Sequence, residues 1–213
     1  MKSAEQIGPR KPRADGLRSR RTILDAAARL ATVDGLEGLS IGRLAEHIGM
    51  SKSGLYAHFG SKEELQLATI ETAKEIFRDD VVVPTEAVEA PRARLEALCE
   101  AFLSHLERRV FPGGCFFVSA AAEFDTHPGR VKEEVAAFLR GWLETLEGLA
   151  ARAQQDGDID AAEDPAQLAF ELDAYLLMAN MAYLLHNDPL TLQRARTAIE
   201  ARITRARPPA RAR

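Results

Sequence analysis

The chain has 213 residues, of which 46% are hydrophobic, 28% charged and 6% aromatic, and a formal net charge of −4, as in an ordinary globular protein. No stretch approaches the roughly 18 apolar residues that a membrane span needs, and the two cysteines, Cys99 and Cys115, are too few for a disulfide framework and match no metal spacing. We therefore expect a protein of the reducing cytoplasm, with no membrane partner, no metal and no cofactor.

Charge is unevenly distributed along the chain. Residues 1–60 hold ten lysines and arginines against six acidic residues, a net charge of +4. Residues 61–213 hold eighteen against twenty-six, a net charge of −8. A basic first part on an acidic body indicates that only the first part meets a polyanion. Charge alone leaves ordinary variation along a chain as the alternative.

Helical periodicity dominates the first third of the chain. Apolar residues recur at intervals of three and four, which predicts an amphipathic helix that Gly35 ends: Ile23, Ala26, Ala27, Leu30 and Ala31. Two short helices are predicted over Ser40–Ile48 and Ser51–Phe59, each with its first serine as the N-cap. Ser61 and Glu64 form the S-x-x-E capping box of a longer helix over 62–77.

Longer helices are predicted in the second part of the chain. They cover about 91–109, 116–124, 165–185 and 190–206, and a further long helix follows "THPG" and ends near "QDGD". The segments "FPGG" and "NDP" are the other breakers. Val81–Val83 is the only β-branched run, and Pro84 ends it, so strand signals are almost absent. The predicted fold class is all-α, with about nine helices.

The two short helices have the spacing of a helix-turn-helix. About three residues join them, with Gly49 in the turn. In the second helix, Leu55 and Phe59 lie four apart and share the face that can be buried. The outer side is then left with residues that can each donate a hydrogen bond to a phosphate or a base edge: Ser51, Lys52, Ser53, Tyr56 and His58.

Further features of this segment suit contact with DNA. The outer side of the second helix carries no carboxylate, which a phosphate backbone would repel. Gly54 permits close approach to a groove, and Lys62 lies at a helix N-terminus, where an anion is favoured. The alternative is that Tyr56 and His58 are ordinary surface residues of a helical hairpin.

The segment "ILDAAARLATVDGLEGLSIGRLAEHIGMSKSGLYAHFGSKEEL" resembles the DNA-binding domain of the TetR (tetracycline-repressor-like) family of bacterial regulators. The resemblance covers residues 18–65 and is most specific in "SKSGLYAHFGSKEEL". It implies that Ser51–Phe59 is the recognition helix in a major groove. Gly42 departs from the pattern, since relatives can offer a polar side chain there. The DNA-contacting residues implied are Ser40, Arg43, Ser51, Lys52, Ser53, Gly54, Tyr56, His58 and Lys62.

Members of that family follow this domain with a helical ligand-binding and dimerisation domain of variable sequence. The charged sequence at each end predicts a disordered basic arm over 1–16 and a basic tail over 207–213. The resemblance implies a helix-turn-helix domain over 17–80 and a ligand-binding and dimerisation domain over 85–206. The implied function is a homodimeric repressor that a small hydrophobic effector releases from a pseudo-palindromic double-stranded DNA operator.

Aromatic and flexible apolar residues of the second part suit a pocket for such an effector. For any single one of them, a place in the core is the alternative. His105 and Asn180 are possible polar anchors. The candidate ligand residues are Phe102, His105, Phe116, Phe117, Ala121, Phe138, Trp142, Tyr175, Met178 and Met181.

The segment 165–185 is apolar on more than one face, with Phe170, Leu177 and Leu184 away from the main stripe. Such a helix is buried on both sides, either in a large core or in a subunit interface. The resemblance favours the interface, with 190–206 completing a four-helix arrangement across a two-fold axis. The candidate interface residues are Leu168, Leu172, Leu176, Ala179, Tyr183, Ala195 and Ile199.

Two other classes of protein remain as alternatives. An enzyme could use Glu123, Asp125 and His127 in "EFDTH", but no partner cluster exists elsewhere, and Asp125 is better explained as a helix terminator. Both cysteines lie in apolar segments where a thiol is usually inert. We therefore expect no catalytic residues. A non-specific architectural DNA-binding protein would need a basic surface, whereas most of this chain is acidic.

Overall fold

The computed structural model describes the backbone of residues 12–209 and the side chains of residues 20–209. Within this range the chain forms nine α-helices and no strand, which confirms the predicted all-α fold. The helices are α1 (Pro12–Asp34), α2 (Ile41–Ile48), α3 (Lys52–Phe59), α4 (Lys62–Phe77), α5 (Pro91–Glu107), α6 (Phe116–Phe124), α7 (Arg130–Gln155), α8 (Pro165–His186) and α9 (Pro189–Arg205).

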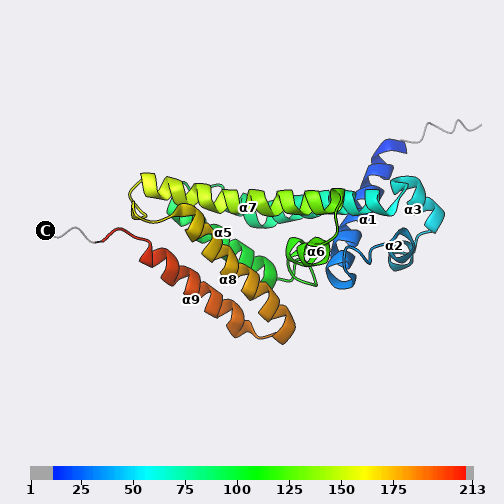
Figure 1. Cartoon of the computed structure of the whole chain (residues 1–213). Coiled ribbons are helices and arrows are strands. Elements are labelled where there is room, and N and C mark those ends of the chain that lie inside the picture. Colours follow the sequence, from blue (N-terminus) through cyan, green and yellow to red (C-terminus); the bar gives the residue numbers. More distant parts are fainter. Residues whose placement is uncertain (1–11, 210–213) are drawn as a thin grey trace, which may run out of the picture.

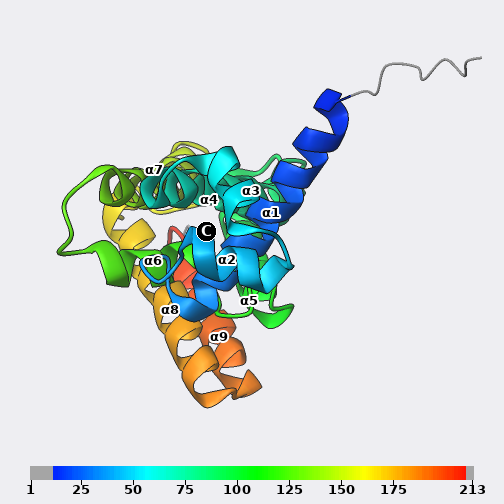
Figure 2. The same ribbon diagram turned by 90° about the vertical axis from the view of Figure 1, so that its right-hand side faces the viewer.

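The helices form a small head and a longer helical body. Figure 1 shows α1, α2 and α3 at one end of the molecule, which we call the head. Helix α4 leaves the head and packs along α7, and α5, α7, α8 and α9 pack on one another to form the body. Helix α6 lies between the two parts and contacts both α1 and α7. Figure 2, seen from the head, shows α8 and α9 projecting to one side of it.

Serine N-caps fix the starts of α2 and α4, as the sequence predicts. The hydroxyl oxygen of Ser40 accepts the N–H of Arg43 at 3.2 Å, and that of Ser61 accepts the N–H of Glu64 at 3.1 Å. The capping box at Ser61 is only half formed, because the Glu64 carboxylate pairs with Arg130 of α7 at 2.7 Å instead of returning to Ser61. A charged partner from another element is the stronger attraction for this carboxylate.

The structure differs from the predicted N-terminal arm over the last five residues of the arm. Helix α1 begins at Pro12, so residues 12–16 of the range assigned to the arm are helical, whereas residues 1–11 lie outside the described part. Proline is well tolerated in a first helical turn because no N–H is needed there, and one glycine weakens a helix without ending it. Of the predicted tail, 207–209 are exposed and follow the end of α9, and 210–213 lie outside the described residues.

An aromatic cluster fills the body where α4, α5, α6 and α7 meet. Phe77 at the end of α4 is contacted edge-on by Phe117, Phe138 and Trp142. Phe102 joins the cluster from α5 beside Trp142. Edge-to-face aromatic pairs add to the area that they bury, so this cluster anchors α4 in the body. It thereby fixes the helix that carries the head.

Helix α8 is long and apolar enough to meet the length and composition criterion for a membrane span, so the expectation that no stretch approaches it is wrong for α8. An interior helix of a soluble protein meets the same criterion. Helix α8 packs against α5, α7 and α9, and 39% of its most apolar window is buried. Its remaining exposed apolar surface therefore calls for a separate explanation.

Candidate nucleic-acid interface and apolar cleft

Helix α3 presents one buried and one exposed face, and the exposed one carries the predicted DNA-contacting side chains. Leu55 and Phe59 are buried in the head. Tyr56 is 60% exposed, and Ser51, Lys52 and Ser53 are exposed beside it. His58 is half-buried. The exposed face offers hydroxyl and ammonium donors and no acidic side chain, which suits a phosphate backbone.

Gly42 of α2 lies beside Lys52, the first residue of α3. A Cβ atom at position 42 would lie 3.4 Å from Cε of Lys52, which is an ordinary van der Waals contact. The space at this position therefore does not require a glycine, and nothing in the described residues explains its place inside the helix.

Two predicted cations at the interface are paired with carboxylates of the α1–α2 turn region. Nζ of Lys62 lies 2.7 Å from Oε1 of Glu37, and this hydrogen bond is the main cause that lowers the pKa of Glu37. The Arg43 guanidinium lies 2.9 Å from the Asp34 carboxylate. These lysine and arginine side chains are substantially exposed, so the pairs are weak and the cations can turn to a phosphate.

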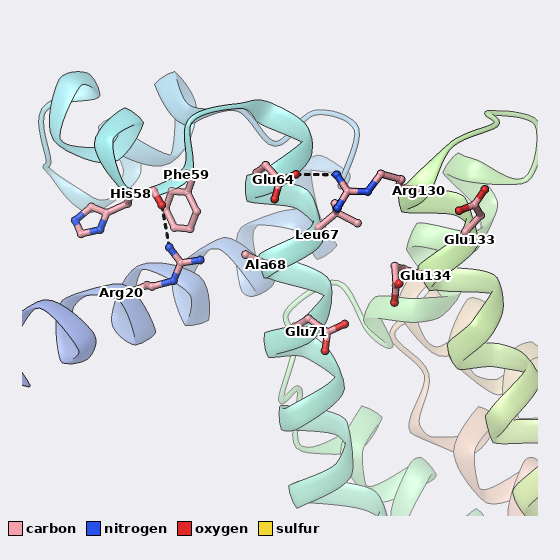
Figure 3. A pocket seen from close by; sticks show the side chains of 10 residues that line it. All are labelled: Arg20, His58, Phe59, Glu64, Leu67, Ala68, Glu71, Arg130, Glu133 and Glu134. Atoms are coloured by element: carbon pink, nitrogen blue, oxygen red, sulfur yellow. Dashed lines mark hydrogen bonds and ion pairs between the residues drawn. The ribbon is translucent and has the colours of Figure 1, made fainter.

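A groove of about 440 Å³ separates α3 and α4 from the start of α7 (Figure 3). Arg20 of α1 lines this groove and contacts α3. Its guanidinium donates a hydrogen bond to the backbone oxygen of His58 at 2.9 Å and lies 4.7 Å above the Phe59 ring. Arg130 reaches across from α7 to Glu64. Glutamates outnumber arginines here, so the groove is not a phosphate-binding surface: Glu64, Glu71, Glu133 and Glu134 against Arg20 and Arg130.

A larger, mainly apolar cleft of about 890 Å³ lies between α6, α7 and α8. Asn180 is one of its few polar residues, and its side-chain oxygen accepts the N–H of Cys115 at 2.8 Å. Asp173 is another, and burial raises the pKa of its carboxyl, which accepts the indole N–H of Trp142 at 2.9 Å. Its size and lining suit a hydrophobic small molecule. The other lining residues are Val118, Ser119, Ala121, Ala122, Leu139, Leu143, Leu177, Met178, Met181, Leu184 and Leu185.

Only part of the predicted ligand set lines this cleft: Ala121, Met178 and Met181. Phe102, His105, Phe116 and Phe117 do not line this cleft but are buried in the body core, so their part in an effector site stays a prediction. Their rings pack on one another and on Phe77, because aromatic pairs gain more from mutual contact than from lining an open space.

The remaining predicted ligand residues line other grooves. Phe138 and Trp142 border a groove of about 550 Å³ between α4 and α7, and Tyr175 borders one of about 410 Å³ between α8 and α9. The sequence feature that indicates the cleft is the second apolar face of α8, which includes Leu177 and Leu184. The alanines of α6 carried no comparable signal, because small residues are common wherever helices pack.

The predicted dimer residues are core residues of the protomer. The apolar face of α8 that begins at Leu168 is covered by neighbouring helices of the same chain, and α9 packs on both α5 and α8. All seven predicted residues are buried within the protomer: Leu168, Leu172, Leu176, Ala179, Tyr183, Ala195 and Ile199. Their part in a dimer interface stays a prediction.

The groups considered for catalysis have structural roles. Asp125 is the C-cap of α6, and the Glu123 carboxylate accepts two backbone N–H groups of the head. Burial raises the pKa of the Cys99 thiol to about 12 and that of Cys115 to about 11, so both thiols stay protonated. Cys115 is the N-cap of α6 and not an interior helical residue.

Comparison with known sequences gives two family matches and several relatives. Residues 23–69 match bacterial regulatory proteins of the tetR family, and residues 91–199 match the tetracyclin repressor-like C-terminal domain. The regulator BetI of Rhizobium meliloti is 35% identical over 79 residues, 37% of this chain, so the chain matches only 39% of that protein's length. The repressor AcnR of Corynebacterium diphtheriae is 27% identical over 179 residues, 71% of this chain and 90% of that protein.

Solved structures share the whole architecture. A TetR transcriptional regulator from Chloroflexus aurantiacus superposes with a TM-score of 0.83 at 29% identity, over 89% of this chain and 96% of that chain. AibR in complex with isovaleryl coenzyme A and operator DNA superposes with a TM-score of 0.68 at 25% identity, over 89% and 98% of the two chains. Because the C-terminal family model matches half of the chain and the other covers the helix-turn-helix, this protein belongs to the TetR family of bacterial transcriptional regulators.

Proposed function

We propose that this protein is a homodimeric, ligand-responsive transcriptional repressor of the cytoplasm, which a small hydrophobic effector releases from a pseudo-palindromic operator. The observation that carries the proposal is the exposed face of α3, which bears Lys52, two serines and Tyr56 without an acid. The name of AcnR as a repressor and the AibR complex with operator DNA support the same function. A pseudo-palindromic operator is expected because the two heads of a dimer, about 34–36 Å apart, would contact successive major grooves.

The proposal assigns DNA binding and ligand binding to separate domains of the chain. The helix-turn-helix domain spans 17–80 and the ligand-binding and dimerisation domain spans 85–206. The two family matches, 23–69 and 91–199, fall inside these ranges. The passage of α4 from the head into the aromatic cluster of the body supports a mechanical link between the two domains.

The effector site that we propose is the apolar cleft between α6, α7 and α8. Its volume of about 890 Å³ holds a drug-sized molecule, and most of its lining is aliphatic. Asn180, Asp173 and Ser119 supply the few polar groups. Such a lining favours a largely hydrophobic organic effector with one or two hydrogen-bonding groups, as the sequence predicts, although most of the residues that would hold it are different ones.

The dimer face that we propose is the exposed apolar stripe of α8, in place of the buried face. Met178 and Met181 are each 56% exposed, Phe170 is 63% exposed and Leu185 is 75% exposed. Leu190 at the start of α9 extends the stripe. A contiguous apolar patch of this kind marks an interaction site. Met178 and Met181 also line the cleft, so a second protomer on this face would border the effector.

The effector site can be tested although its ligand is unidentified. A thermal-shift screen of hydrophobic compounds identifies molecules that raise the melting temperature, and each is then titrated against the protein–operator complex. We expect such binders to lower operator affinity about 5- to 150-fold, the usual range for coupled sites. Ala121→Phe narrows the cleft and should abolish the response with operator binding intact. If the binders leave operator affinity unchanged, the proposed ligand response is wrong.

Phe117→Asp is not a suitable variant for the same test. Phe117 is fully buried and packs against Phe138 and Phe77, so an aspartate there would place an unpaired charge in the core. Leu143→Gln is the better way to change the polarity of the cleft, because Leu143 is half-buried and lines the cleft from α7, away from the proposed dimer face.

A further inference from the structure

Glu123, the penultimate residue of α6, reaches from the wall of the cleft into the head. Its Oε1 accepts the N–H of Leu36 at 3.1 Å, and its Oε2 accepts the N–H of Glu37 at 2.8 Å. Both amides belong to the turn between α1 and α2, directly before the helix-turn-helix. A single carboxylate therefore joins α6 to the segment that leads into α2. Hydrogen bonds to an ionised acceptor are stronger than those between neutral groups.

The turn is shaped to receive this carboxylate. Gly35 has a φ of +83°, and a Cβ atom there would lie 2.9 Å from Oε2 of Glu123. Any other residue would be strained in this conformation and would push the carboxylate away. The glycine that the sequence indicates as a helix terminator thus also permits the close approach of α6.

The same turn is tied to the helix that follows α3. The side-chain amide of Gln66 donates to the backbone oxygen of Leu36 at 2.8 Å, and Lys62 pairs with the side chain of Glu37. Gln66 and Lys62 belong to the first turns of α4, and two residues separate α4 from the end of α3. The position of the turn is consequently linked to both ends of the helix-turn-helix, through α2 on one side and α4 on the other.

The start of α6 is held as well, so the helix is fixed to the head at both ends. Before α6, the N–H of Gly113 donates to the hydroxyl of Thr32 in α1 at 3.1 Å. A Cβ atom at Gly113 would lie 1.8 Å from the backbone oxygen of Thr32, so this contact also requires a glycine. Between the two ends, α6 contributes four residues to the cleft: Val118, Ser119, Ala121 and Ala122.

The contact between α7 and the start of α4 is weaker. Arg130 at the start of α7 pairs with Glu64 at 2.7 Å and with Glu63 at 3.4 Å, and all three side chains are more than half exposed. Exposed ion pairs contribute little to stability. The bonds from Glu123 differ in kind, because they hold backbone atoms of the turn itself.

We propose that Glu123 is a positioning residue for operator recognition, which sets the orientation of α2 and α3 relative to α6. Any displacement of α6 by a molecule in the cleft is then passed to the head through this carboxylate, a consequence that rests on the proposed effector site. The positioning role itself needs no ligand. It predicts that a change at Glu123 alters how well the two heads fit the operator, although Glu123 touches no DNA.

The test compares Glu123→Gln with Asp125→Asn in the full chain. Glutamine keeps the size of the side chain but turns an NH₂ group toward one of the two backbone N–H groups. The control removes the same charge two residues away, where Asp125 is exposed. Losing a negative charge favours DNA binding by itself, so the proposal predicts the opposite sign: about tenfold weaker binding of Glu123→Gln to a duplex selected by the wild-type protein. The dependence on salt should not change, because no phosphate contact is lost.

Amide hydrogen exchange supplies a second measurement that needs no operator. In Glu123→Gln the amides of Leu36 and Glu37 should exchange faster than in Asp125→Asn, with the interior of α2 and α3 unchanged. Equal operator affinity, or equal exchange at the turn, in the two variants overturns the proposal. So does faster exchange throughout the head, which would indicate a role in stability alone. A wild-type protein that binds no specific duplex refutes the proposed function, and the exchange data still decide the role of Glu123.

Discussion

Tyr56 and Lys62 are the residues whose exposure ties the head most directly to a phosphate backbone. Tyr56 is well exposed on α3, and Lys62 lies at the N-terminus of α4, where the helix dipole also favours an anion. In the proposed complex with DNA, Lys62 exchanges its partner Glu37 for a phosphate. Because that pair is exposed, little is lost in the exchange.

We expect Tyr56→Ala and Lys62→Ala to weaken binding to all duplex sequences alike, because phosphate contacts carry no sequence information. Lys62→Ala should also reduce the slope of log affinity against log salt by about 0.9, the value for one phosphate contact. Arg140→Ala is the matched control, since it removes one exposed positive charge from α7. Fluorescence anisotropy over a range of salt concentrations measures both quantities. Unchanged affinity in both head variants would remove α3 and α4 from the interface.

His105 is a buried histidine whose role is structural. Its Nδ1 lies 2.6 Å from Oδ2 of Asp80, a residue of the π-helical turn Arg78–Val82 that ends α4. Arg108 binds the same carboxylate. Nε2 of His105 has no hydrogen-bond partner among the described residues, and the ring packs on Phe77 and Phe111. Burial lowers the pKa of His105 from its ordinary value of 6.5, against the opposing effect of the hydrogen bond that its ring donates to Asp80.

The pH dependence of stability follows from this lowered pKa. A group with a lower pKa in the folded state binds more protons when unfolded, so its contribution is complete above about pH 6.5 and is lost as the pH falls through the folded-state pKa. Denaturant unfolding at a series of pH values should show this loss in the wild type. His105→Gln keeps a donor for Asp80 but cannot titrate, so its stability should change less over this range. His47→Gln, at an exposed position on α2, is the control; identical pH profiles for His105→Gln and the wild type would contradict this view.

At the scale of the elements, the helix boundaries could largely be predicted from the sequence. Ser40, Ser51 and Ser61 cap the helices as predicted, and α4 and α6 have the predicted bounds. Capping and glycine signals are local, so they survive in the folded chain. The half-formed capping box at Ser61 is the exception, because Arg130 comes from a part of the chain 66 residues away.

Which faces of the helices meet could not be predicted in the same way. The sequence shows that α8 has two apolar faces, but it does not show which one the protomer covers and which one it leaves exposed. Helices α5, α7 and α9 cover the face of Leu168 and Leu172, and the face with Met178 and Met181 stays open. The aromatic candidates lie away from the cleft for the same reason, since only tertiary packing distinguishes a ring in the core from one that lines a cleft. Thus the exposed face of α3 could be placed from the sequence and the cleft could not.

Arg202 joins α9 to α8 and to the loop before it, and it is the most buried ionic contact of these elements. Its guanidinium binds Glu163 and Glu171, and only 7% of the side chain is exposed. Arg202→Leu should lower the free energy of unfolding by about 2–4 kcal/mol, because two partly buried carboxylates lose their partner. Arg196 on the same helix also pairs with two glutamates but is more exposed, so Arg196→Leu should cost about 1 kcal/mol or less. Equal losses in urea unfolding would contradict this ranking.

At the scale of the whole molecule, the exposed stripe of α8 should hold two protomers together. Met181→Arg places a charge in the centre of the proposed interface, where it would have no partner, and should shift the protein from dimer to monomer at micromolar concentration. Val83→Arg makes the same change at another exposed apolar residue and should leave the dimer intact. Sedimentation equilibrium distinguishes the two states. A wild-type monomer, or a dimeric Met181→Arg protein, would show that the stripe has another purpose.

The account as a whole depends on sequence-specific binding of a dimer to duplex DNA. The most direct measurement is a titration of the protein against fragments of its own upstream DNA, with bulk genomic DNA as competitor and with the binding stoichiometry recorded. The account predicts one fragment bound by two protomers per site, at least about 10³-fold more tightly than the competitor at physiological salt. A ratio near one for every fragment would contradict it and would instead indicate a non-specific DNA-binding protein.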